Sequence, residues 1–175
     1  YPENATENFI AIKDSAESFA DEFTARAAAA YEGGENFVIS PISVYSALAM
    51  AAECADGSTR EEILSALNVD YELLRSDFLN LYRSVLCDTK TAKAVLGNSV
   101  WVGEGIPVKQ TGIDALAEGY GAYSYSADFA NDNEGANQAV RHFVKEQTNG
   151  LIDRDFELSE DTFFTLINTL YLKDN

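Results

Sequence analysis

The stretch Asn36-Phe37-Val38-Ile39-Ser40-Pro41-Ile42-Ser43 joins a short apolar run to the start of a helix. The apolar run at 36–39 is too short for a helix and predicts a β-strand. Ser40 is a favourable N-cap residue, and Pro41 fits the first helical turn, where no N–H partner is lost. Residues 44–52 are apolar nearly all round, which predicts a helix buried on most of its sides.

Further helices are predicted on both sides of this unit. Upstream, apolar residues spaced by three and four indicate an amphipathic helix over 7–31 that Gly33-Gly34 ends. Downstream, Thr59 and Glu62 form a capping box that predicts a helix over 60–67. The same periodicity predicts three more helices, over 73–86, 111–121 and 133–148.

Strands are predicted in the second half of the chain, at 94–102, 123–129 and 162–173. Because the strands are separated by helices without regular βαβ alternation, the predicted fold class is α+β. The strand at 162–173 is apolar enough to lie centrally in a sheet, so it needs neighbours on both sides. We therefore expect the natural protein to continue past Asn175.

The composition limits the classes of partner. The 175 residues include 12 Lys+Arg and 29 Asp+Glu, a net charge of −17, which argues against nucleic acid and anionic membranes. No apolar run is long enough to span a membrane. The helix at 73–86 offers only Arg75 and Arg83 beside Glu72 and Asp77, so we expect no heparin binding.

Few residues could carry catalysis or bind a metal. His142 lies within a predicted helix and no Gly-x-Ser-x-Gly motif accompanies it, so a hydrolase that uses His142 is a weak hypothesis. Cys54 and Cys87 could form one disulfide or remain two buried thiols. The carboxylates around Asp153 and Asp155 lack the order of a calcium loop. We predict neither a metal site nor a cofactor.

Three polar residues stand in apolar surroundings: Ser40 and Ser43 at the start of the buried helix, and Asn168 within the last strand. One interpretation is helix capping by the serines and a satisfied backbone contact for the asparagine. The alternative is one buried polar cluster formed by all three. Sequence spacing alone does not decide between them.

Several motifs occur in one order along the chain and together resemble the serpin signature. They are Asn36 to Ser43, Ala47-Leu48-Ala49-Met50, Gly57 to Ile63, Asn98 to Val102, Tyr125 to Phe129, Phe143 to Gly150, and Asn168 to Lys173. The resemblance implies serpin helices A to F, the first strand of sheet B at 36–39, and strands 2, 1 and 3 of sheet A at 94–102, 123–129 and 162–173. It also implies that residues 1–175 are the N-terminal half of a single serpin domain. The reactive-centre loop and the C-terminal half would lie outside this chain.

The function implied by the resemblance is suicide-substrate inhibition of serine proteases, with cysteine proteases as a second target class. The chain would then be no enzyme, would act outside the cell, and would need the C-terminal portion of the same serpin as its partner. The resemblance implies that Ser40, Ser43 and Asn168 form the shutter beneath sheet A. On the strand beside the insertion gap, it points to Thr165, Ile167 and Thr169 as loop-insertion residues. The alternative is a non-inhibitory serpin that acts as a carrier or chaperone.

Overall fold

The computed structural model describes residues 6–34 and 36–174. In this part of the chain the helices are α1 (Glu7–Ala30), α2 (Pro41–Cys54), α3 (Gly57–Leu67), α4 (Tyr71–Val85), α5 (Gln110–Tyr120) and α6 (Asn133–Gln147). The strands are β1 (Cys87–Asp88), β2 (Ala92–Gly103), β3 (Ala122–Ala127) and β4 (Phe164–Asp174). The fold is therefore α+β, as the order of predicted elements indicates.

β2 lies at the centre of a single sheet. β3 pairs with β2 in parallel, and β4 pairs antiparallel along almost the whole of β2. The two-residue strand β1 pairs with the beginning of β2. Within residues 6–34 and 36–174, β4 pairs with β2 alone, so the outer edge of β4 has no strand partner there.

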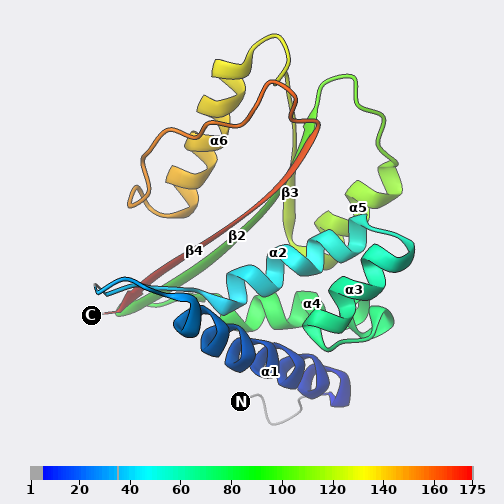
Figure 1. The fold of residues 1–175 in the computed structure, drawn as a ribbon, viewed down its shortest axis with the longest axis vertical. Helices are drawn as coiled ribbons and strands as arrows, with labels where there is room; N and C mark the ends of the chain where they lie inside the picture. The colour runs from blue at the N-terminus through cyan, green and yellow to red at the C-terminus, as the bar shows by residue number, and fades with distance from the viewer. Residues whose placement is uncertain (1–5, 35, 175) are drawn as a thin grey trace.

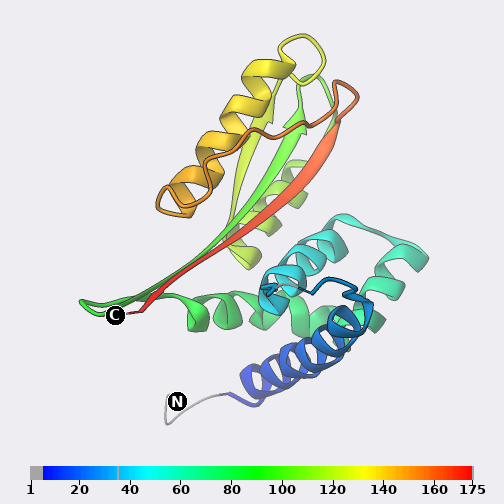
Figure 2. The same ribbon diagram turned by 60° about the vertical axis from the view of Figure 1, so that its left-hand side comes forward.

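Helices cover both faces of this sheet (Figure 1). Because side chains alternate along a strand, Val100, Phe164 and Leu166 contact the core formed by α1 to α5. Trp101 and Ile167 contact a second, smaller core beneath α6. Figure 2 shows α6 and the segment that follows it lying over the second face.

α2 is the most deeply buried helix of the larger core. Its residues Tyr45, Ala49 and Met50 are fully buried, as its nearly uniform apolar sequence predicts. The Tyr45 hydroxyl lies 2.9 Å from Ser15 Oγ, which donates to the Leu67 carbonyl oxygen at 2.7 Å. This pair of bonds ties α1, α2 and the end of α3 together and satisfies polar groups that would be costly to bury alone.

Two local predictions are wrong. Residues 36–39, expected to be the first strand of sheet B, form no strand, because a sheet needs a hydrogen-bonded neighbour and no described residue supplies one. α3 begins at Gly57 rather than at Arg60, because Asp56 caps it by accepting from Gly57 N at 2.9 Å. The remaining predicted helices and strands are confirmed with small shifts of their ends.

No helix among the described residues has the length and apolar character needed to cross a bilayer.

Candidate functional site

A pair of asparagines joins β2 to β4 at the centre of the sheet. Asn98 and Asn168 lie directly opposite in the antiparallel register, and Asn168 Nδ2 donates to Asn98 Oδ1 at 2.6 Å. Asn98 is fully buried, and its own Nδ2 donates to the Tyr120 carbonyl oxygen at 2.8 Å. The two amides thus link both strands to the C-terminal end of α5.

Ser40 and Ser43 form a separate polar pair at the start of α2. Ser40 Oγ accepts from Ser43 N at 3.3 Å and donates to Ser43 Oγ at 2.9 Å, so Ser40 caps the helix as its sequence predicts. Among the described residues no hydrogen bond joins these serines to Asn168. Asn168 nevertheless shares the face of β4 that Leu166 presents to α2, since alternate residues point the same way.

Thr165, Ile167 and Thr169 occupy the opposite face of β4, beneath α6. Ile167 packs against the core that contains Trp101. Thr169 is 6% exposed, and its hydroxyl is buried without a hydrogen-bond partner among the described residues. A Cβ at the opposite residue, Gly97, would lie 2.7 Å from Thr169 Oγ1 and 2.8 Å from Gln147, so only glycine lets α6 approach so closely.

α6 is tied to the segment that follows it by ion pairs and an amide. Arg141 pairs with Asp153 at 2.7 Å and with Asp155 at 2.6 Å, and Lys145 pairs with Asp153 at 2.7 Å. The hydrogen bonds from Lys145 and then Arg141 lower the pKa of the Asp153 carboxyl. We call this set, together with the bonds between Asn137 and Leu158, the α6 clasp.

The Asn137 side chain completes the clasp, because its amide bonds to both the N–H and the C=O of one residue, as the backbone of a neighbouring strand would. Its Oδ1 accepts from Leu158 N at 2.8 Å, and its Nδ2 donates to the Leu158 carbonyl oxygen at 3.1 Å. Asn133 Nδ2 donates to the same carbonyl at 2.9 Å. The side chains of Phe156 and Leu158 then pack on the core beneath α6. The clasp therefore fixes α6 and residues 153–158 as one layer over β4.

The residues considered for catalysis lie apart from these features. The His142 side chain is 71% exposed and lies 3.3 Å from Glu146 on the next turn, an ordinary surface arrangement. Cys54 is exposed and Cys87 is half-buried, and both are free thiols, so neither the disulfide nor a pair of buried thiols is present. Within residues 6–34 and 36–174, no three potential metal ligands come together.

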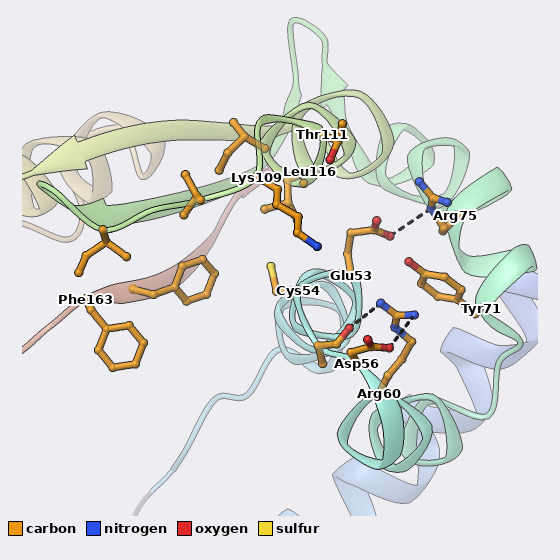
Figure 3. Close-up of a pocket in the computed structure, with 16 residues that line it drawn as sticks. Glu53, Cys54, Asp56, Arg60, Tyr71, Arg75, Lys109, Thr111, Leu116 and Phe163 are labelled. Carbon is orange, nitrogen blue, oxygen red and sulfur yellow. Dashed lines mark hydrogen bonds and ion pairs between the residues drawn. The ribbon is translucent and has the colours of Figure 1, made fainter.

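A cavity of about 700 Å³ opens where α2, α3, α4 and α5 meet the start of β4 (Figure 3). Its apolar wall consists of Ile106, Val108, Ile113, Leu116, Phe163 and Phe164. Its polar wall consists of Glu53, Cys54, Asp56, Arg60, Tyr71, Arg75, Lys109 and Thr111. The cavity therefore has one apolar wall and one wall of polar and charged side chains.

Most charges of the polar wall are already paired. Arg75 pairs with Glu53 at 3.3 Å, and the Tyr120 hydroxyl donates to the same carboxylate at 3.0 Å. Burial and then the Glu53 charge raise the pKa of the Tyr120 hydroxyl. Arg60 donates to the carbonyl oxygens of Ala52 and Ala55 and so satisfies the end of α2. The Tyr71 ring lies against both guanidinium groups, 4.2 Å from that of Arg60.

Asn98 was not predicted from the sequence as a member of this polar site, whereas Asn168 was. It interrupts an apolar strand in the same way as Asn168, and that signal would have found it. Its partnership with Asn168 could not be found from spacing, because 70 residues separate the two.

Comparison with known proteins identifies the family. A family model described as "Serpin (serine protease inhibitor)" matches residues 14–175. A rice protein named "Putative serpin-Z12" is 37% identical over 161 residues, which cover 88% of this chain and 37% of that protein. Pig corticosteroid-binding globulin and rat alpha-1-antiproteinase are each 26% identical, over 80% and 79% of this chain and 36% and 35% of their own lengths. The chain belongs to the serpin family.

Solved structures show the same fold. Reactive-loop-cleaved human thyroxine-binding globulin matches with a TM-score of 0.83 and 23% identity, over 94% of this chain and 50% of that chain. Cleaved kallistatin complexed with heparin matches with a TM-score of 0.83 and 22% identity, over 94% and 49% of the two chains. The chain thus spans about half of those solved chains, and little more than a third of the related proteins named above.

Proposed function

We propose that this chain forms the N-terminal half of a single serpin domain whose complete form is a suicide-substrate inhibitor of serine proteases, with cysteine proteases as a second target class. The observation that carries the proposal is the outer edge of β4, which pairs with no strand in the described part of the chain. Membership of the serpin family supports a role for this edge in accepting the cleaved reactive loop. The loop, and the C-terminal portion that would complete the sheet, would lie outside this chain.

In this proposal the protease carries out the covalent chemistry. Its nucleophile attacks a carbonyl carbon of the reactive loop, the peptide bond breaks, and the leaving amine takes the proton that the nucleophile gives up. The acyl-enzyme then remains while the cut loop enters the sheet beside β4 as an added strand. This chain contributes no catalytic residue, and we propose no enzymatic activity, no cofactor and no nucleic-acid, membrane or heparin partner for it. We propose an extracellular location.

The residues of β4 and α2 would have different parts in that insertion. Thr165, Ile167 and Thr169 point to the α6 side, so they would lie next to side chains of an inserted strand on that face. Asn168, with Ser40 and Ser43 on the α2 side, would form the shutter that opens and closes. The asparagine pair across β2 and β4 supports this assignment, because it holds two strands in fixed register at mid-sheet.

The test uses the complete protein that contains this chain. Incubation with proteases of trypsin-like, chymotrypsin-like and papain-like specificity should give, with at least one, stoichiometric loss of activity and a covalent complex stable in denaturing detergent. Cleavage should also raise the midpoint of thermal unfolding, because the inserted strand completes the sheet.

A carrier function is the second candidate, because one relative is a corticosteroid-binding globulin. The same experiment separates the two functions. Cleavage of the complete protein by every protease tested, without a covalent complex and without thermal stabilisation, would contradict inhibition and favour the carrier.

A further inference from the structure

The cavity between α2, α5 and the start of β4 holds a cation that no group of the described chain neutralises. Lys109 reaches from the start of α5 into this space (Figure 3), and its ammonium makes no hydrogen bond or ion pair with a described residue. The two nearby carboxylates are engaged, Glu53 by Arg75 and Asp56 by Arg60. The Lys109 residue is exposed, so its ammonium is open to an anion that enters the cavity from solvent.

The apolar wall of the cavity is also incompletely covered. Ile106 is 39% exposed, Val108 48% and Phe163 65%, and all three line the same cavity. Because withdrawing apolar surface from water is favourable, a ligand that lay against this wall would gain stability without opening the main core.

The first turn of α5 adds a weaker attraction for negative charge. The helix begins at Gln110 with neither a side-chain cap bond nor an acidic residue in its first turn. Its free N–H groups and its dipole therefore favour an anion near Lys109 and Thr111, both of which line the cavity.

We propose that this cavity binds a small amphipathic carboxylate, with the carboxylate against Lys109 and the apolar body against Ile106, Val108 and Phe163. The cavity volume of about 700 Å³ falls within the range of about 300–1,000 Å³ that is usual for small-molecule sites. Charge complementarity selects the carboxylate over a neutral or cationic amphiphile. The site does not rest on protease inhibition, because it shares no residue with the asparagine pair or the insertion face of β4.

The test compares two probes of equal chain length, decanoate and decanol, by calorimetric titration of the complete protein. Decanoate should bind saturably at one site, and decanol at least about tenfold more weakly, the factor that corresponds to one charge-assisted contact. Lys109→Gln should weaken decanoate about tenfold and leave decanol unchanged, whereas Lys109→Arg should retain binding. Phe163→Ala should weaken both probes alike, since it removes only apolar contact.

A matched control and a positional readout complete the experiment. Lys90→Gln removes a lysine from an exposed turn away from the cavity and should leave both affinities unchanged. Bound decanoate should slow alkylation of Cys54, whose thiol lies in the cavity (Figure 3), but not that of Cys87. Equal decanoate affinity in the parent protein and Lys109→Gln would overturn the proposal. So would the absence of saturable binding in the complete protein, which would mean that another segment fills the cavity.

Discussion

The side-chain amide of Asn168 on β4 donates a hydrogen bond to Asn98 on β2, on the face of β4 that α2 covers. Asn98 is fully buried, and its own Nδ2 is already engaged by the Tyr120 carbonyl. Asn168→Ala would therefore leave Asn98 Oδ1 without a donor in the interior. We predict that this substitution lowers the free energy of unfolding of the complete protein by about 1–3 kcal/mol, or promotes premature opening of the sheet.

Denaturant titration measures this change, with Gln138→Ala as the control. Gln138 is exposed, and its side chain donates to Glu134 on its own helix, so its loss should change stability by less than about 0.5 kcal/mol. Asn168→Asp should be worse than alanine, because it sets a carboxylate oxygen against Asn98 Oδ1. A loss for Asn168→Ala no greater than that of the control would contradict the prediction.

Cys54 is exposed, but its thiol should react slowly at neutral pH. Partial burial of the sulfur and then the nearby Glu53 carboxylate raise the pKa of Cys54 to about 11. Since the thiolate is the nucleophile, the rate of alkylation by iodoacetamide should keep rising with pH until about pH 11. The measurement is the pH profile of Cys54 modification by mass spectrometry. A plateau below pH 9 would show that the thiol ionises normally.

Single residues were predictable where their role is local. Ser40 caps α2 as its sequence indicates, because an N-cap needs only the next three residues. Asn168 was recognisable as a polar residue in an apolar strand, but its bond to Asn98 depends on the register of two distant strands. Lys109 gave no signal, because its lack of a partner among the described residues follows from how α2, α3, α4 and α5 converge around one cavity.

At the level of elements, the α6 clasp predicts how the covering layer moves. Asn137 Oδ1 accepts from the Leu158 N–H, so Asn137→Ala should leave that amide without its acceptor, while Asn133 still donates to the Leu158 carbonyl oxygen. We expect hydrogen exchange at the Leu158 amide to accelerate about tenfold, as the loss of roughly 1.4 kcal/mol of local protection implies. The measurement is exchange monitored by mass spectrometry in the complete protein.

The neighbouring substitution Gln138→Ala is the control for the clasp, because it lies on the exposed side of the same helix. It should leave exchange at Leu158 unchanged. Arg141→Gln should have a smaller effect than Asn137→Ala, because its pairs with Asp153 and Asp155 lie at the surface, where water and salt screen them. The reverse order of effects would mean that charge, rather than the amide, holds the clasp.

Elements with strong periodicity were predicted to within a few residues, and those that depend on distant partners were not. The helix over 133–148 is α6 at Asn133–Gln147, because its apolar side alone specifies it. The run at 36–39 has the composition of a strand but no neighbour in the described chain, so it remains irregular. β1 is only two residues long and exists because it meets the start of β2, which no local pattern reveals.

At the scale of the whole molecule, the net charge of −17 should weaken the binding of polyanions such as heparin. Like charges repel, and α4 carries Arg75 and Arg83 beside acidic residues rather than a basic face. We predict no retention on a heparin column at physiological ionic strength. The related fold of kallistatin has been solved with heparin, so the fold itself does not prevent such binding. Retention that weakens with added salt would contradict the prediction.

The outer edge of β4, which has no strand partner in the described chain, should affect how residues 1–175 behave in isolation. β4 spans Phe164–Asp174, and in the described chain its backbone pairs only with β2, so one row of N–H and C=O groups lacks a strand partner. Long apolar edges of this kind pair with other chains. We predict that residues 1–175 alone inhibit no protease and are poorly soluble or oligomeric, and that the C-terminal portion of the same serpin restores a monomer. The measurement is light scattering on the purified fragment before and after that portion is added, with protease assays on both samples. Because the prediction depends on the unpaired edge, a stable monodisperse monomer without the added portion, or a covalent protease complex formed by the fragment alone, would refute it.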